Sequence, residues 1–427
     1  MEPVKTALIG AGDRGKFVYA QYAKMNPKLI KIVAVAERSP EKRTLVQEEH
    51  AIPGAYVFSA WEDAFGSLPS GTEAVIIATP DRLHHGPLAK AMEGNYHILC
   101  EKPVVPTLEE CIEVEKAAER FNKVFMTGYV LEYTAFYVKI KELLDQGRIG
   151  KLIGIDAVEN VGHLHMAHSF VRGNWRNLKE SSPMILAKSC HDMDLLYWLA
   201  GAPCETVSSY GNLHYFRAEN APAGSPGRCL DGCPHIMDCP YDAAKTYLTG
   251  NTGWPASTIS TDLSIEGRIK ALETGPYGRC VYRCDNDVVD HQTAAMQFAN
   301  GVTANFTMSA FTMEIHRGIT LFGTKGEIRG DLEENRFTVK EFASRNAETV
   351  ELAKPAGAAG GGSLDGHSGG DFALITGFVN SIRGTGREQA SAKNAFESHY
   401  MALAAEYSRT HGGKSVSLNT FRTGGFE

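Results

Sequence analysis

A glycine-rich turn close to the N-terminus constrains the fold of this chain more than any other feature. The apolar run 4–9 leads into Gly10-Ala11-Gly12-Asp13-Arg14-Gly15, and a helix-compatible segment follows at 16–25. A strand, a glycine turn and a helix in this order place helix-terminal amides where they can hold a pyrophosphate. We therefore expect a dinucleotide site that uses Gly10, Gly12, Asp13, Arg14 and Gly15.

A second apolar run indicates which dinucleotide binds. Residues 30–36 end at Glu37, about 20 residues beyond the glycines, where an acidic residue reaches the adenosine ribose. A carboxylate there accepts hydrogen bonds from ribose hydroxyls and repels a 2′-phosphate, which favours NAD over NADP. Arg38 works against this preference because a guanidinium can pair with the phosphate.

Composition and length exclude several classes of function. The chain has 427 residues and a net charge of −7, so it offers no basic field for nucleic acid. No apolar run is long enough to span a bilayer, and no signal sequence precedes the first strand. We expect a cytoplasmic protein with no nucleic-acid or membrane partner. Its length predicts two domains, at 1–128 and 129–427.

The patterns of the two domains predict different sheets. Apolar runs at 75–78, 96–100 and 124–128 alternate with helical patterns, which predicts a doubly wound parallel sheet of the Rossmann type. The segments 151–159 and 290–311 alternate apolar with polar residues, which predicts a second, α+β domain with a large, mostly antiparallel open sheet. Two further helices are expected at 372–382 and 391–409.

The first domain should bind its ligand beyond the carboxyl ends of the parallel strands. Glu101-Lys102-Pro103 follows one such strand directly, so Lys102 lies beside the expected nicotinamide and is a candidate for proton transfer. The other cofactor contacts expected at this rim are Thr79, Pro80, His84 and Glu101.

A second candidate centre opens the helical pattern that runs from Lys188 to Gly201. His191 and Asp194 are three residues apart and can share one helix face. A histidine of near-neutral pKa can take a hydroxyl proton while hydride leaves the same carbon, and a carboxylate could orient its ring. A histidine that caps the helix or packs in the core remains an equal alternative.

Three blocks in this order and spacing resemble the Gfo/Idh/MocA oxidoreductase family. They are Ala-Leu-Ile-Gly-Ala-Gly at 7–12, Ala-Thr-Pro-Asp-Arg-Leu-His at 78–84 and Glu-Lys-Pro at 101–103, with further matches at 143–150, 298–301 and 323–326. The resemblance implies catalytic roles for Lys102 and for His191, which precedes Asp194 by three residues. It also implies that subunits meet on the open face of the second sheet, as a homodimer or homotetramer.

The chain departs from the family pattern at Ala187. The family commonly has an aspartate four residues before the histidine, and here Lys188 follows the alanine. Lys188 could supply a second cation for an anionic substrate, or hold the base neutral by charge repulsion. Alternatively, it points to solvent.

A polar cluster at 163–176 precedes this centre and suits a sugar. An indole can cover an apolar sugar face, while arginine donates to hydroxyls or a carboxylate. The alternatives are a metal at His-X-His or a solvated loop with one anchored tryptophan. The favoured substrate contacts are His165, His168, Trp175 and Arg176.

An insertion at about 212–290 is rich in cysteine, glycine and proline. Cys229-X3-Cys233-X5-Cys239 is followed after a long gap by Cys280-X3-Cys284. Five thiols offer a structural zinc its four ligands with one to spare. Reduced thiols, disulfides and an iron–sulfur cluster are the other possibilities. The glycine-rich segment 356–362 could be a flap that brings His367 to the substrate, or simply a linker.

Together these features predict an enzyme that moves hydride between NAD and a secondary hydroxyl of a sugar, sugar derivative or cyclitol. Redox-neutral glycoside cleavage through a transient keto-sugar is the first alternative. A non-catalytic regulator that senses dinucleotide is the second.

Overall fold

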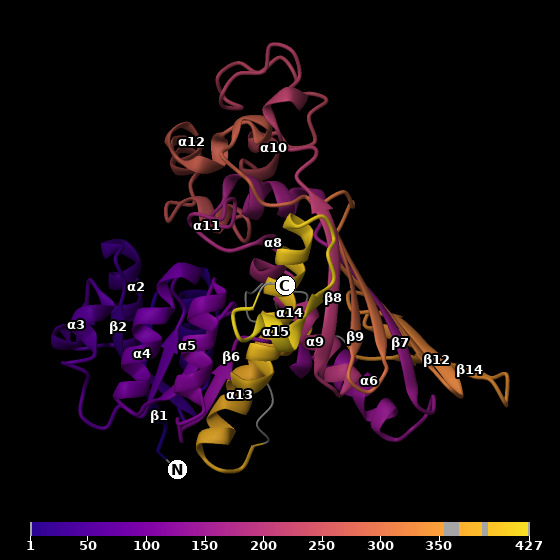
Figure 1. The fold of residues 1–427 in the computed structure, drawn as a ribbon. Coiled ribbons are helices and arrows are strands. Elements are labelled where there is room, and N and C mark those ends of the chain that lie inside the picture. The colour runs from indigo at the N-terminus through magenta and orange to yellow at the C-terminus, as the bar shows by residue number, and fades with distance from the viewer. Residues whose placement is uncertain (1, 354–366, 387–391, 426–427) are drawn as a thin grey trace.

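The computed structural model describes residues 2–353, 367–386 and 392–425. The chain forms two sheets on opposite sides of the molecule, with the C-terminal helices between them and a lobe above (Figure 1). The segment 356–362, expected to be a flap or a linker, lies outside the described residues.

The first sheet is parallel and has six strands in the order β3-β2-β1-β4-β5-β6. The central strand β4 is buried at every position, as expected when helices cover both faces of a sheet. This confirms the expected doubly wound fold. The strands are β1 Val4–Ile9, β2 Ile30–Ala36, β3 Val57–Phe58, β4 Ala74–Ile77, β5 His97–Cys100 and β6 Phe125–Thr127.

The helices of this domain begin where the sequence supplies caps. The Thr107 hydroxyl accepts a hydrogen bond from the Glu110 amide at the start of α5, and Ser39 caps α2 in the same way. The segment after the glycine turn starts as a π-helical stretch, Gly15–Ala20, before it becomes α-helical. The helices are α1 Gln21–Met25, α2 Pro40–His50, α3 Trp61–Ala64, α4 His85–Glu93 and α5 Leu108–Ala118.

The second sheet has nine strands in the order β14-β13-β12-β11-β7-β10-β9-β8-β15. It is antiparallel except for the pair β10 and β7, which confirms the expected mostly antiparallel sheet. Exposed and buried residues alternate along β9 and β10, so one face packs on helices and the other is open. The strands are β7 Leu152–Asn160, β8 Cys204–Asn212, β9 His291–Phe298, β10 Thr303–Ser309, β11 His316–Gly323, β12 Gly326–Asp331, β13 Arg336–Glu341, β14 Ala347–Glu351 and β15 Val416–Ser417.

The helices of the second domain cover the inner face of this sheet and reach back to the first. The expected helix through His191 is divided in two, because the helical turn α8 ends at Ala187 and α9 begins at Cys190. The C-terminal helices match the expected ranges within two residues. The helices are α6 Ala135–Asp145, α7 His163–His165, α8 Met184–Ala187, α9 Cys190–Ala200, α13 Gly370–Ile382, α14 Ala392–Thr410 and α15 Leu418–Phe421.

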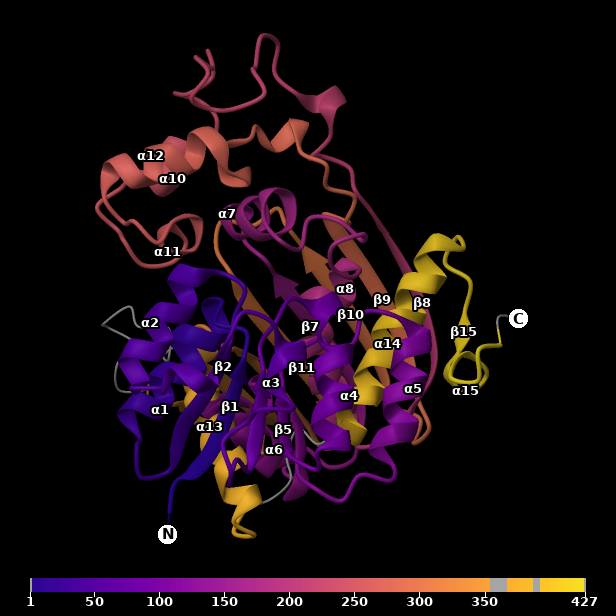
Figure 2. The same cartoon turned by 90° about the vertical axis from the view of Figure 1, so that its left-hand side faces the viewer.

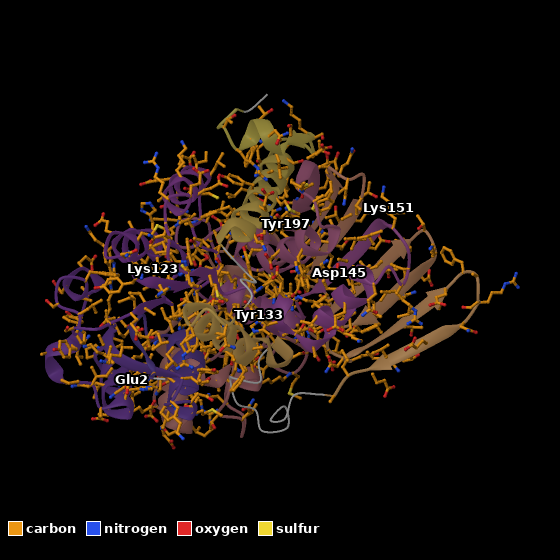
Figure 3. The ribbon with its side chains drawn as sticks, turned by 90° about the horizontal axis from the view of Figure 1, so that it is seen from below. Glu2, Lys123, Tyr133, Asp145, Lys151 and Tyr197 are labelled. Atoms are coloured by element: carbon orange, nitrogen blue, oxygen red, sulfur yellow. The ribbon has the colours of Figure 1, made fainter. Side chains whose placement is uncertain are left out.

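The C-terminal helices join the two sheets. Helix α14 packs against α5 of the first domain and against α9 and β8 of the second. Helix α13 packs on the first domain, where the Tyr22 and Thr376 hydroxyls lie 2.8 Å apart. The view from below has Lys123 on the side of the first sheet, Lys151 on the side of the second, and Tyr197 between them (Figure 3). Both sheets therefore contribute to the region between them.

The insertion forms a separate lobe at the top of both side views (Figure 2). Its helices are short: α10 Ala243–Tyr247, α11 Ala256–Ile259 and α12 Ile265–Thr274. None of the described helices is long and apolar enough to cross a membrane.

Candidate functional site

The glycine turn has the geometry that a dinucleotide requires. Gly10 has a φ of +93°, and a Cβ there would lie 2.6 Å from the Ala78 carbonyl oxygen. A Cβ at Gly12 would meet no heavy atom within 4 Å, so the space above the loop is open to phosphates. A Cβ at Gly15 would overlap the Gly10 carbonyl, as expected where helix and strand approach closely. Asp13 is exposed beside this turn.

Glu37 lies next to the turn at the end of β2. One carboxylate oxygen accepts a hydrogen bond of 2.6 Å from the Ala11 amide, and the other accepts one of 2.9 Å from the Ser39 amide. These bonds fix the carboxylate at the position where a ribose is expected. Arg38 is exposed.

Arg14 connects the glycine turn to two buried carboxylates. Its Nε lies 2.5 Å from Glu101 and its Nη2 lies 2.6 Å from Asp371, at the start of α13. The Tyr19 hydroxyl also donates to Glu101, at 2.7 Å. Burial works to raise the pKa of Asp371, but the charges of Arg14 and His367 hold it at about 2. Arg14 and Glu101, expected to contact the cofactor, are thus engaged with each other, and they shape the turn from behind.

The rim after β4 is held together by His84. Its two ring nitrogens each lie 2.7 Å from a carbonyl oxygen, one of Pro103 and one of Thr79. The Thr79 hydroxyl donates to the Leu83 carbonyl at 3.0 Å, across the turn that Pro80 begins. His84 therefore joins this turn to the Glu-Lys-Pro loop, and both of its nitrogens are occupied in doing so.

Lys102 extends from the first domain to the second. Its ammonium donates a hydrogen bond of 2.8 Å to the Ala187 carbonyl at the end of α8. It also lies 5.8 Å from the centre of the Trp175 ring. The Trp175 indole donates to Asp81 at 3.1 Å, so the tryptophan is itself anchored to the first domain. Where the family places an aspartate side chain, this chain offers the ammonium a backbone carbonyl.

His191 lies in α9 with its ring between two other rings. The ring centres of Tyr129 and His367 are 5.8 and 5.6 Å away. Burial, together with the charges of Lys102 and His367, lowers the pKa of His191 well below its usual value. A neutral imidazole can accept a proton at pH 7, so the lowered pKa fits the expected base.

The expected contact between Asp194 and His191 is not formed. Asp194 faces Glu132 instead, and burial together with this second carboxyl raises the pKa of Asp194 well above its usual value. Two buried carboxyls in contact share a proton because they cannot both ionise. Asp194 therefore does not orient the His191 ring in this structure.

Lys188 belongs to a buried network of charges. Its ammonium lies 3.1 Å from Glu159, whose other oxygen lies 2.5 Å from Arg317. Arg317 also lies 3.1 Å from Asp192. Burial, with Glu159 nearby, raises the pKa of Asp192 to about 7 against the charge of Arg317. Lys188 therefore does not point to solvent, and its charge is offset by Glu159.

His165 lies beside Trp254 of the insertion, with ring centres 5.2 Å apart. Its Nδ1 is buried and has no hydrogen-bond partner among the described residues. Burial and the charge of Lys188 lower its pKa well below the usual value. His165 is therefore a neutral ring with a free polar atom, as a substrate contact would be.

His168 and Arg176 are occupied by the insertion. His168 Nδ1 lies 2.8 Å from the Tyr247 hydroxyl and its Nε2 lies 3.0 Å from Thr258. Burial and the charge of Arg172 lower its pKa to about 3. Arg176 pairs with Asp285 at 2.9 Å. Both residues hold the lobe in place, so any effect they have on substrate is indirect.

Several residues of this region gave no signal in the sequence. Tyr129, Glu132, Glu159 and Arg317 each come close to the centre only through packing. His367 and Asp371 could have been paired, because residues four apart at the start of a helix can meet. Their atoms are 3.0 Å apart.

Comparison with known proteins identifies both domains. Residues 4–129 match a family described as an oxidoreductase family with an NAD-binding Rossmann fold. Residues 141–418 match the C-terminal alpha/beta domain of an oxidoreductase family. Both descriptions agree with the two sheets.

Relatives over long and short stretches include oxidoreductases. The putative oxidoreductase YteT of Bacillus subtilis (strain 168) is 26% identical over 72% of this chain and 74% of its own length. The match covers about half or less of the other relatives. Inositol 2-dehydrogenase of Leifsonia xyli subsp. xyli is 30% identical over 37% of this chain and 43% of its own. The 2,7-anhydro-N-acetylneuraminate hydratase of Escherichia coli (strain K12) is 30% identical over 33% and 36%.

Solved structures share the whole fold. A levoglucosan dehydrogenase in complex with NADH and levoglucosan superposes with a TM-score of 0.70 over 98% of this chain and 100% of that one. The two sequences are 20% identical, so the likeness establishes the architecture.

Proposed function

Because this chain belongs to the Gfo/Idh/MocA family of oxidoreductases, we propose that it moves hydride between NAD and a secondary hydroxyl of a sugar, sugar derivative or cyclitol. The observation that carries the proposal is the meeting of Lys102 and His191. The ammonium ends at the second domain, and its charge is close enough to lower the pKa of the imidazole. A cation and a neutral base side by side suit the oxygen and the proton of one hydroxyl.

The residues divide the work as follows. Bound NAD supplies the hydride acceptor. Neutral His191 takes the hydroxyl proton, and the Lys102 ammonium donates to the same oxygen and stabilises its developing negative charge. The roles of Lys102 and His191 could be exchanged. Trp175 and His165 are the proposed substrate contacts, because one ring lies over Lys102 and the other keeps a buried nitrogen free.

The substrate class follows from the relatives. An inositol dehydrogenase and a levoglucosan dehydrogenase act on a cyclitol and an anhydro sugar, as their names state. Both compounds carry secondary hydroxyls on a ring, which match a lysine and a histidine beside a nicotinamide.

A second candidate function is redox-neutral cleavage through a transient keto-sugar. It is favoured by the relative named as a hydratase, because adding water involves no net oxidation. The same Lys102 and His191 would start either reaction. The two functions differ only in whether hydride leaves the enzyme on the cofactor.

One assay separates these functions. The protein is incubated with NAD and a panel of inositols, levoglucosan and aryl glycosides, while NADH and free sugar are both measured. We expect NADH and oxidised product in equal amounts. Repeated release of free sugar without added NAD and without NADH would establish cleavage instead. NAD binding with neither product would indicate a dinucleotide-sensing regulator and contradict the enzyme proposal.

NAD is the proposed cofactor, and Glu37 tests the choice. In Glu37→Ala, the repulsion of a 2′-phosphate is lost while Arg38 remains. We expect the preference for NAD over NADP, measured as the ratio of kcat/KM values, to fall by about tenfold or more. Glu41→Ala is the matched control, because this carboxylate is exposed and bonds the Ser39 hydroxyl. An unchanged preference in Glu37→Ala would remove Glu37 from the cofactor site.

We also propose that copies of the chain meet on the open face of the nine-stranded sheet, as a dimer or tetramer. The outward residues of β9 and β10 include Thr293, Ala295, Thr303, Asn305 and Thr307. Such short side chains leave a flat surface on which a second sheet could pack.

A further inference from the structure

The cysteine-rich insertion contains two segments with one pattern, and the structure places them side by side. Residues 228–233 and 279–284 both read Arg-Cys-X3-Cys. The arginines that open the two segments form an antiparallel bridge. The amides of Cys229 and Cys280 each donate a hydrogen bond of 2.9 Å to the facing strand. Two cysteine pairs aligned in this way resemble the paired ligands of structural zinc sites, where cysteines two to four positions apart are typical.

Four of the five cysteines surround one small cavity. The cavity has a volume of about 20 Å³, which is room for roughly one water-sized body. Cys284 is not among the residues that line it, and its thiol lies 3.4 Å from the Cys280 carbonyl, to which it donates. The cysteines around the cavity are Cys229, Cys233, Cys239 and Cys280.

Arg172 gives an independent sign that negative charge belongs here. Its side chain lines the cavity and is 1% exposed. It donates to the carbonyls of Arg279 and Tyr241 at 2.7 Å each, and its Nη2 lies 3.6 Å from the Cys229 sulfur. Among the described residues, no carboxylate pairs with this guanidinium. A buried charge without a partner is costly, and thiolates would compensate it.

We propose that Cys229, Cys233, Cys239 and Cys280 bind one structural zinc ion as four thiolates. Zinc with four thiolates carries a net charge of −2, which Arg172 offsets. Burial raises the pKa of Cys229 and of Cys239, so these thiols are protonated without metal and must release their protons when zinc binds. Cys284 is the cysteine left over.

The sulfur atoms must move inward to reach the ion. Among the described residues, no three of them lie within 4.8 Å of one another, whereas zinc holds sulfur at about 2.3 Å. The only described group that already meets this distance is His316, Asp331 and Glu333. Glu333 there is exposed and accepts the Arg317 amide at 2.6 Å, so an acidic hairpin explains that group without a metal.

The zinc would connect the insertion to the substrate region. Arg172 ends the segment Met166–Arg172, which also carries His168, and Trp175 follows it closely. An ordered metal site therefore fixes the chain on which two of the expected substrate contacts stand. Loss of zinc should loosen this wall and raise KM more than it lowers kcat.

The test is the metal content of the purified full-length protein, measured by mass spectrometry together with a count of reactive thiols. We expect one zinc per chain in the wild type. We expect Cys233→Ser to lower the zinc content by about tenfold or more. Cys284→Ser is the matched control, because this cysteine holds the same place in the second segment but lies outside the cavity, and it should keep its zinc.

A second measurement covers variants that fail to fold. Titrating the wild type with a mercurial reagent should release zinc as the thiols react, with a chromogenic chelator reporting the metal. A wild type that contains no zinc after expression in zinc-supplemented medium would overturn the proposal. So would iron with a brown chromophore, thiols lost to disulfides in the denatured wild type, or equal zinc loss in Cys284→Ser.

Discussion

Lys102→Met should lower kcat/KM by about 10³-fold while the affinity for NAD changes little. The substitution removes the ammonium that bonds Ala187 and lies by the Trp175 ring. Methionine keeps the apolar stem of the side chain, so the packing of the loop should survive. The hydroxyl oxygen then develops its negative charge without a cation beside it. Initial rates of NADH formation give the loss, and a fluorescence titration gives the dissociation constant for NAD.

Lys90→Met is the control for this variant. Lys90 is on the outer side of α4, where it pairs with Glu93 at 2.7 Å and is half exposed, and its replacement should leave both quantities unchanged. Unchanged turnover in Lys102→Met would refute the catalytic assignment. A large loss of NAD affinity would show that the lysine holds the cofactor instead.

Arg317→Met should lower the free energy of unfolding by about 3–5 kcal/mol, because it breaks a buried network of charges. Arg317 is 3% exposed and lies between Glu159 and Asp192. Without it, Lys188 would be the only nearby cation shown to pair with Glu159. Urea denaturation of the purified protein measures the loss.

Two further variants control the Arg317 result. Arg336→Met breaks a surface pair with Glu334, both of which are about half exposed, and should cost about 0–1 kcal/mol. The double variant Glu159→Gln/Arg317→Met should cost less than the sum of its single changes, because the buried negative charge is removed together with its partner. A loss below about 1 kcal/mol in Arg317→Met would mean that the network is solvated.

Periodicity in the sequence was enough to predict both sheets. The run from Ala74 to Ile77 is buried on both faces, and only a parallel strand covered by helices accepts such a sequence. The alternation from His291 to Phe298 appears directly as exposed and buried positions. The motifs around Gly10, Thr79 and Lys102 also identified the family, which the two domain matches confirm.

The partners of polar side chains could not be predicted in this way. The pattern placed Asp194 on the helix face of His191, yet the carboxyl faces Glu132. It left Lys188 open between a site role and solvent, and the structure pairs it with Glu159. Helix spacing states which residues share a face, but the group that meets this face belongs to an element elsewhere in the chain.

The sequence by itself determined the two sheets, the glycine turn and the lysine at the end of β5, because local spacing and burial encode them. Only the tertiary structure decided that Lys102 reaches the Ala187 carbonyl, that Arg14 bonds Asp371, and that four of the five cysteines share a cavity. These contacts join residues up to 357 positions apart. A hydrogen bond or ion pair depends on where two distant backbones come to lie, and that is decided by the packing of the whole chain.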